Sequence, residues 1–420
     1  MDTLGEMFEN GEIEQAVSIN DGFKIGCLEW VDDVMTCTNG VTNQHKILSK
    51  VNEFAEINKL EWGQEKCQVM QVGKKVKVPD NWQLGEKEIS NTNSYKYLGD
   101  IITNDGKNDK NILARENKMN ALIRQINTTA SSDVMRGIQT EVILKLYESS
   151  IIPSLLNNAE SWTLTRKDET RLDQIGIRAI KRLFGLPTTS PNVAIIHTFG
   201  IFYISQIVDK KKFLYLHKLL TGDQGRWKSK MTHTMAAKNI GWVTNMNEKL
   251  SEYELETDWS VIKQKTVIEW RNSVSKAVLK RNGKKLMESC QRYSDGSYKV
   301  HTKTKHIHKM LSEEEYKAEP RRQIIVGTKQ RTRTIFLAQN GMLQCGKNMK
   351  GTIPEICPNC VAPDNENHRL NACPRWTDAN HSDFVEFNDI YSEDNNKVNQ
   401  VINKVENVWE VKYANGRMKK

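Results

Sequence analysis

The segment CPNCVAPDNENHRLNAC, residues 357–373, constrains the fold of this chain more than any other. Cys357, Cys360, His368 and Cys373 follow the spacing C-x2-C-x7-H-x4-C. Three thiolates and one imidazole fill a tetrahedral Zn²⁺ shell without leaving a position for water, which is the composition of a structural site. Turn-forming residues dominate the rest of the segment, so we expect it to fold around the metal. The alternative is a chance cluster of thiols.

The residues around this cluster indicate a nucleic-acid partner. Arg369, Arg375 and Trp376 add two cations and an aromatic ring to the segment. Basic and aromatic side chains together suit RNA or single-stranded DNA, because they contact phosphates and stack on bases. The sequence therefore predicts a small zinc knuckle that binds RNA or DNA.

The other cysteines and the hydropathy bear on the compartment. Five of the eight cysteines are scattered, a number too small for a disulfide scaffold, which fits a reducing compartment. The first fifteen residues are acidic and lack an apolar core segment, so we expect no signal peptide. No run of 18 apolar residues occurs, so no membrane-spanning helix is expected. The protein is expected to be intracellular, with nucleus and cytoplasm both open.

A second motif places two aspartates inside an apolar run, CLEWVDDVMTC at residues 27–37. The pattern predicts two short strands joined by a two-residue turn, since the Asp carboxylate bonds readily to the local backbone. Asp32 and Asp33 could equally hold a hard divalent cation such as Mg²⁺. The segment alone leaves both interpretations open.

The periodicity of apolar residues divides the chain into a mixed part and a helical part. A helix over 43–62 ending at Gly63, a strand over 67–72 and a strand over 95–103 closed by the turn NDG form a small α+β unit. Helices then follow from residue 108 to residue 222, and one of them opens with Thr165 and Asp168, close to a capping box. The four helices expected there cover 112–126, 140–156 (ending near Pro153), 165–187 and 204–222.

The charge of the chain is concentrated in one span. Residues 259–335 hold 19 Lys/Arg against 7 Asp/Glu, a surplus of 12 that exceeds the +9 of the whole chain. Such a surplus is typical of a surface that binds a polyanion, and phosphate backbones are the usual partner. A solvated helical face is the alternative. Outside a basic helix over 265–285 and another helix over 396–411, residues after 222 show little pattern.

The order of these segments resembles the second half of a non-LTR retrotransposon reverse transcriptase. The resemblance covers roughly residues 1–220 and 320–376. Residues 223–320 match only in position, as a loose linker. The segments that carry it, besides the Cys-Cys-His-Cys cluster, are WVDD at 30–33, EWGQEKCQVMQVG at 61–73, SYKYLGDIITNDG at 94–106, KLYESSIIPSLLNNAESW at 145–162 and IRAIKRLFGLP at 177–187.

The resemblance implies roles for particular residues. Asp32 would bind the catalytic Mg²⁺ ions with Asp33 beside it, and Trp30 stands where Tyr or Phe is usual. Lys66 would lie near the incoming triphosphate. The turn formed by Tyr97, Leu98 and Gly99 would be the primer grip, which steadies the 3′ end. The helices from 108 to about 220 would be the thumb, and the basic span with the knuckle would bind RNA and DNA.

Two-metal phosphoryl transfer requires carboxylates from at least two strands, and the family supplies one from an earlier strand. No apolar strand carrying an aspartate precedes Asp32 in this sequence. We therefore expect a truncated RNA-directed DNA polymerase that is inactive alone. Three possibilities remain open: a polymerase completed in trans, a non-catalytic zinc-knuckle protein that binds RNA or DNA, and a domesticated interaction protein or an untranslated pseudogene.

The expected fold is α+β and mostly helical, with a partial palm (hairpin, helix and strands), a helical thumb and a small zinc knuckle. The expected divisions are a partial palm at 1–107, a thumb-like domain at 108–222, a basic linker or helical region at 223–335, the knuckle region at 336–376 and a polar tail at 377–420.

Overall fold

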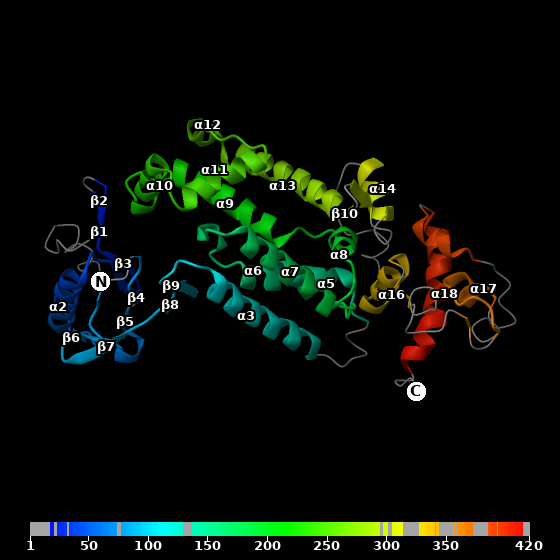
Figure 1. Cartoon of the computed structure of the whole chain (residues 1–420), viewed down its shortest axis with the longest axis horizontal. Coiled ribbons are helices and arrows are strands. Elements are labelled where there is room, and N and C mark those ends of the chain that lie inside the picture. Colours follow the sequence, from blue (N-terminus) through cyan, green and yellow to red (C-terminus); the bar gives the residue numbers. More distant parts are fainter. Residues whose placement is uncertain are drawn as a thin grey trace. The chain divides into compact units, whose positions relative to one another are not determined.

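The computed structural model divides the chain into two compact units, each discontinuous in sequence (Figure 1). Unit 1 comprises residues 1–115, 158–168 and 211–270, and unit 2 comprises 116–157, 169–210 and 271–420. The structure describes residues 17–20, 23–31, 33–73, 77–128, 137–294, 297–300, 305–313, 327–340, 342–343, 356–357, 360–372, 385–392 and 394–414. These residues are mostly helical with small sheets, as the sequence predicts.

The strands of unit 1 are short. They form four antiparallel hairpins, β1–β2, β3–β4, β6–β7 and β8–β9, and β5 joins β7 in parallel. Their bounds are β1 (Val17–Asn20), β2 (Phe23–Ile25), β3 (Cys27–Trp30), β4 (Asp33–Thr36), β5 (Gln68–Val69), β6 (Asn81–Leu84), β7 (Lys87–Asn91), β8 (Ser94–Tyr97) and β9 (Asp100–Thr103). The predicted strand over 67–72 is thus reduced to two residues.

The core of this mixed part lies between one helix and the β6–β7 hairpin. Helix α2 (Val41–Ile57) buries Ile47, Leu48, Val51 and Phe54 against Trp82, Leu84 and Ile89 (Figure 1). The i, i+3, i+4 spacing predicted this helix face. The hairpin was missed, although Trp82 and Leu84 alternate with polar residues before a glycine turn.

Helix α2 ends earlier than predicted. Lys59 adopts a left-handed φ of 55°, and the Leu60 amide donates a 2.8 Å hydrogen bond to the Ala55 carbonyl. This arrangement stops a helix in the way a glycine usually does, so the end falls at Ile57 rather than at Gly63.

The predicted strand over 95–103 is a hairpin. Tyr97 pairs with Asp100 across a turn of Leu98 and Gly99, which have φ values of 48° and 88°. The alternation of apolar residues did not predict this turn, because Leu98 continues the apolar run. A left-handed φ is ordinary for glycine and uncommon for leucine.

Asp100 fixes this hairpin to its surroundings in unit 1. Its carboxylate accepts hydrogen bonds from the Arg115 guanidinium at 2.8 Å, the Asn111 amide at 3.1 Å and the Asn158 amide at 3.0 Å. The Arg115 side chain is only 7% exposed. A buried guanidinium without a carboxylate is costly, so this cluster determines where the Leu98 turn lies.

Four helices continue from one unit into the other. These are α3 (Asp109–Thr128), α7 (Arg166–Leu183), α9 (Ile204–Thr221) and α13 (Val267–Ser289). The remaining helices described in unit 1 are η1 (Gln64–Lys66), η3 (Ala159–Ser161), α10 (Trp227–Lys238), α11 (Trp242–Glu252) and α12 (Trp259–Gln264). These last three helices lie within residues 223–335, the span expected as a basic linker or helical region.

The capping box predicted for α7 is present. The Thr165 amide donates to Asp168 Oδ2 at 3.0 Å, and the Asp168 amide donates to Thr165 Oγ1 at 3.2 Å. A second box before α13 was missed, although Thr266 and Glu269 have the ideal spacing and make the same two hydrogen bonds.

The described residues of unit 2 form a set of helices and one hairpin. Its further described elements are α5 (Thr140–Leu146), the π-helix η2 (Tyr147–Ile151), α6 (Ile152–Leu155), α8 (Asn192–Phe199), β10 (Gln291–Ser294), β11 (Ser297–Val300), α14 (Lys305–Glu313), α16 (Lys329–Gln339), α17 (Glu366–Asn371), η5 (Phe387–Tyr391) and α18 (Asn395–Ala414). Pro153 does not end the helix predicted over 140–156, because a π-turn precedes it and the proline occupies the first turn of α6.

A buried carboxylate joins three helices of unit 2. Asp173 on α7 accepts hydrogen bonds from the Ser205 amide at 2.8 Å and hydroxyl at 3.1 Å, and from Lys285 Nζ on α13 at 2.6 Å. Lys285 Nζ also lies 4.3 Å from the centre of the Tyr203 ring. This cluster fixes the rotation of α13 about its axis.

No helix in the described part of the chain is long and apolar enough to cross a lipid bilayer.

Removing the Asp100 carboxylate is expected to destabilise unit 1. Asp100→Ala leaves the buried Arg115 guanidinium without its counter-charge, so we expect a loss of about 3 kcal/mol in unfolding free energy, measured by urea denaturation. Asp80→Ala, at an exposed aspartate, is the matched control and is expected to change stability by less than about 0.5 kcal/mol. Equal stability of the two variants would contradict the role given to Asp100.

Candidate metal centre and the aspartate hairpin

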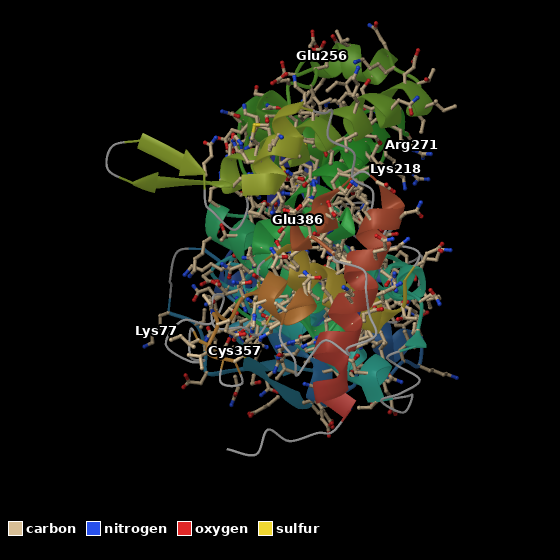
Figure 2. The ribbon with its side chains drawn as sticks, turned by 90° about the vertical axis from the view of Figure 1, so that its right-hand side faces the viewer. Lys77, Lys218, Glu256, Arg271, Cys357 and Glu386 are labelled. Atoms are coloured by element: carbon tan, nitrogen blue, oxygen red, sulfur yellow. The ribbon has the colours of Figure 1, made fainter. Side chains whose placement is uncertain are left out.

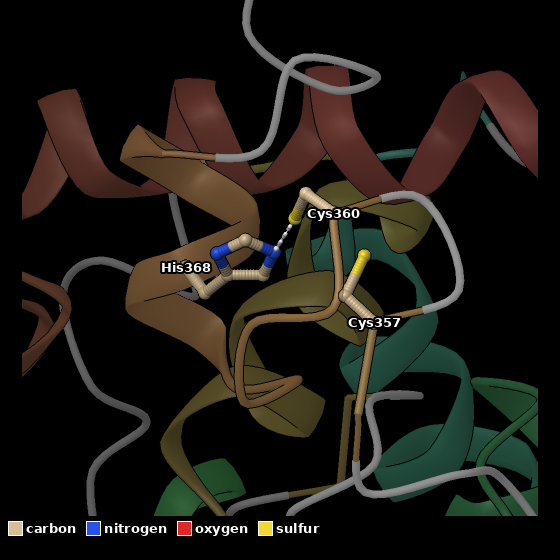
Figure 3. Close-up of side chains that lie close together, drawn as sticks. All are labelled: Cys357, Cys360 and His368. Atoms are coloured by element: carbon tan, nitrogen blue, oxygen red, sulfur yellow. Dashed lines mark hydrogen bonds between the residues drawn. The ribbon is translucent and has the colours of Figure 1, made fainter.

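Two thiols and one imidazole converge in the carboxyl-terminal part of unit 2. The ligand atoms of Cys357, Cys360 and His368 all lie within 4.8 Å of one another. Cys360 Sγ is 3.1 Å from His368 Nε2, and in Figure 3 the three side chains point toward one another. Cys357, labelled in Figure 2, is only 2% exposed. These residues form a group that could hold a metal ion.

The backbone around the cysteines is a tight loop. The Cys357 amide donates to the Ala362 carbonyl at 2.7 Å, and the Val361 amide donates to the Cys357 carbonyl at 3.0 Å. His368 comes from α17, whose first turn is capped by Asn365, since the Asn365 side chain accepts from the His368 amide at 2.9 Å. The loop and the cap together bring the imidazole to the thiols.

Val361 holds a strained position in this loop. Its φ is 61°, and its side chain is 77% exposed. A β-branched residue in the left-handed region is a genuine outlier, because its Cβ crowds the neighbouring carbonyl. The closure of the loop around the two cysteines maintains this conformation.

Arg369 points into the protein. Its guanidinium donates to Asp364 Oδ1 at 2.6 Å and to Asp364 Oδ2 at 2.5 Å, and the Asp364 side chain is 1% exposed. Asp364 lies between Cys360 and His368 in sequence, and Arg369 lies on α17. The bidentate pair therefore joins the loop to this helix. Arg369 therefore has a structural role in this loop, and its predicted contact with nucleic acid stays a prediction.

The geometry fits a tetrahedral metal ion. Bond lengths near 2.3 Å to sulfur and 2.0–2.1 Å to nitrogen place neighbouring ligand atoms about 3.5–3.8 Å apart. In the described trio all ligand atoms lie within 4.8 Å of one another and the Cys360–His368 separation is 3.1 Å, so the spacing is near that of a metal shell. The predicted fourth ligand, Cys373, and the predicted contacts Arg375 and Trp376 lie outside the described residues.

The aspartate motif of unit 1 forms the predicted hairpin. Strand β3 pairs with β4 so that Trp30 lies opposite Asp33, with a two-residue turn between them. Val31 in that turn has a φ of 56° and is 78% exposed, and Trp30 is 63% exposed. Asp33 is exposed, and Asp32 lies outside the described residues. The hairpin thus presents its tip to solvent.

Two tyrosines connect this hairpin with the other predicted residues. The Tyr97 hydroxyl donates to the Leu28 carbonyl of β3 at 3.4 Å, and the Tyr95 hydroxyl donates to the Lys66 carbonyl at 2.8 Å. Burial is the main reason that the pKa of both phenols is raised, and the Asp33 carboxylate raises it further. Both phenols therefore stay protonated at neutral pH and keep donating these hydrogen bonds.

The structure thus brings Asp33, Lys66 and the Leu98 turn into one neighbourhood of unit 1. The sequence analysis did not single out Tyr95 and Asp100. Tyr95 bonds to the Lys66 carbonyl, and Asp100 bonds to Arg115 beside the Leu98 turn. The alternation in SYKYLGD places Tyr95 on the same strand face as Tyr97, which could have indicated that both tyrosines act together. Nothing local indicates that Asp100 pairs with Arg115, fifteen residues away.

No protein-family model matches the sequence, and no curated protein matches it either.

The metal centre can be tested by its stoichiometry. We expect one tightly bound metal ion per chain, measured by elemental analysis after dialysis, and at least a tenfold loss in His368→Ala, since one ligand of the shell is removed. His233→Ala, at an exposed histidine of α10, should retain the metal. Full metal content in His368→Ala would exclude this histidine as a ligand.

Proposed function

We propose that this chain binds RNA or DNA, as a relative of the non-LTR retrotransposon reverse transcriptases, with a zinc knuckle and a helical region that contact the strand. The observation that carries the proposal is the convergence of Cys357, Cys360 and His368. Thiolates and imidazole together favour Zn²⁺ over Mg²⁺, which prefers oxygen ligands. Bound zinc would hold the loop and α17 as one unit, and Cys373 would complete the shell.

The charge on α13 supports a polyanionic partner. Lys276, Lys280 and Lys284 are exposed and follow one another at i, i+4 spacing, so they form one stripe. Arg271, labelled in Figure 2, is exposed on the same helix. The inward stripe consists of Trp270, Val274, Val278, Asn282 and Leu286, all buried.

No acidic residue interrupts this helix between Glu269 and Glu288. The burial of one stripe and the Asp173–Lys285 contact orient the three lysines toward solvent. An uninterrupted row of cations opposite a buried stripe is suited to phosphates, and it is the most concentrated part of the basic span.

The lysine stripe can be tested through salt dependence. For a single-stranded RNA of 20 nucleotides, replacing Lys276, Lys280 and Lys284 by Gln should reduce the slope of log K against log salt by about 2, since each phosphate contact contributes about 0.7. Fluorescence anisotropy across a salt series measures this slope.

A charge-matched control separates the stripe from net charge. The triple variant Lys46→Gln, Lys59→Gln, Lys107→Gln removes three exposed lysines of unit 1 and is expected to leave the slope close to that of the wild-type chain. A wild-type affinity independent of salt, or equal slopes for both triple variants, would contradict the proposed contact.

Polymerisation of DNA on an RNA template is a second candidate function. The observation that favours it is the hydrogen-bonded link from Tyr97 to β3 and from Tyr95 to Lys66, which holds the Asp33 hairpin beside the predicted primer grip. Asp32 and Asp33 would supply carboxylate oxygens for Mg²⁺, whose role is to stabilise the attacking and leaving oxygens of phosphoryl transfer. A carboxylate from another strand would be needed to complete that pair.

Primer extension tests this second candidate. Under this second candidate, purified chain with Mg²⁺, an RNA template and a DNA primer would extend the primer. The double variant Asp32→Asn, Asp33→Asn would abolish extension, because neutral amides bind Mg²⁺ far more weakly than carboxylates. RNA binding of the same variant is the folding control and should be unchanged. Wild-type protein that binds RNA without extending a primer would leave nucleic-acid binding as the function.

A further inference from the structure

An exposed tryptophan stands at the start of α10, in unit 1. Trp227 is 43% exposed, although tryptophan is usually well covered in a folded protein. Arg226 precedes it, and Lys228 and Lys230 follow it within one turn. Residues 224–247 contain four Lys/Arg and no Asp/Glu. The ring therefore lies in a locally basic surface.

The backbone that carries Trp227 is firmly anchored. Ser229 is 4% exposed, and its hydroxyl donates to the Leu219 carbonyl of α9 at 3.1 Å. The Gln224 amide donates to the carbonyls of Leu219 and Leu220 at 3.2 and 3.0 Å. These bonds satisfy the last carbonyls of α9 and fix the start of α10 to it. The tryptophan thus projects from a rigid base.

One cation lies over the ring, and two more are close to it in sequence. Lys228 Nζ lies 5.6 Å from the centre of the Trp227 ring. The Arg226 side chain is 75% exposed, and its contact with Asp223 is a loose 3.8 Å. Lys230 follows Trp227 at i+3, so the two side chains share a helix face. An exposed aromatic face bordered by cations can stack on a base while the cations contact the flanking phosphates.

We propose that Arg226, Trp227, Lys228 and Lys230 form a stacking platform for single-stranded nucleic acid. The proposal rests on the proposed function, and it adds a second contact, in unit 1, to the knuckle and the lysine stripe. A single strand is the occupant that fits best, because its bases expose their flat faces. In a duplex those faces are covered by neighbouring base pairs.

The test measures binding of a fluorescein-labelled 20-nucleotide poly-U RNA to the full chain. Trp227→Leu keeps an apolar side chain and removes the aromatic face, so we expect affinity to fall roughly 5- to 100-fold, the range reported for loss of one stacked base. Its salt slope should stay unchanged, because no phosphate contact is lost. Trp227→Phe should bind within about threefold of the wild-type chain, since the aromatic face remains.

Two controls separate stacking from other effects. Ile240→Ala removes an aliphatic side chain that is 50% exposed just beyond α10, and it should leave RNA affinity unchanged. The double variant Arg226→Gln, Lys228→Gln should reduce the salt slope by about 1.4, since each phosphate contact in a single strand contributes about 0.7. Thermal unfolding of each variant verifies that the fold is intact.

Each outcome supports or overturns the platform. Folded Trp227→Leu that binds poly-U as tightly as the wild-type chain overturns it while leaving the proposed function standing. Equal loss of affinity in Trp227→Leu and Trp227→Phe also overturns it, because stacking would then not be the cause. An equal loss for a blunt RNA hairpin duplex overturns the single-strand assignment. Failure of the wild-type chain to bind any RNA overturns both the platform and the proposed function.

Discussion

The buried carboxylate of Asp173 sets the orientation of the helices on which the surface of unit 2 depends. It accepts from Ser205 on α9 and from Lys285 on α13, so three helices meet at one charge. A buried carboxylate is tolerated only when its hydrogen bonds are complete, and here the partners come from elements far apart in sequence. Because Lys285 faces this charge, the lysines at 276, 280 and 284 face solvent. The position of one buried charge thus helps to determine which lysines of α13 lie on the exposed side of the helix.

The metal centre depends on a second buried pair. Asp364 and Arg369 join the loop that carries Cys360 to the helix that carries His368. The pair stabilises the same arrangement of backbone that a bound metal ion would require. Binding of a metal ion by these residues would therefore be coupled to folding of the segment, in which Val361 has a left-handed φ.

The β3–β4 and β8–β9 hairpins of unit 1 share a backbone feature in their turns. Val31 and Leu98 both occupy left-handed turn positions with exposed aliphatic side chains, where glycine or asparagine would be less strained. A strained backbone conformation is kept when contacts with neighbouring residues offset its cost. Here the hydrogen bonds of Tyr97 and Asp100 provide such contacts.

The sequence by itself determined the features that depend on neighbours along the chain. The i, i+3, i+4 stripe of α2, the capping box of Thr165 and Asp168, and the C-x2-C spacing are local, since each involves residues within a few positions of one another. The resemblance to a reverse transcriptase also rests on such local motifs in order.

Only the tertiary structure decided which polar side chains are engaged inside the fold and which remain outside. Arg369 looked like a ligand contact and is buried against Asp364, whereas Trp227 carried no motif and is exposed among cations. Asp100 reaches Arg115 and Asn158 through contacts that no local pattern encodes. The physical reason is that desolvation and long-range pairing depend on the whole fold, whereas helix and turn propensities depend on the chain's immediate neighbours.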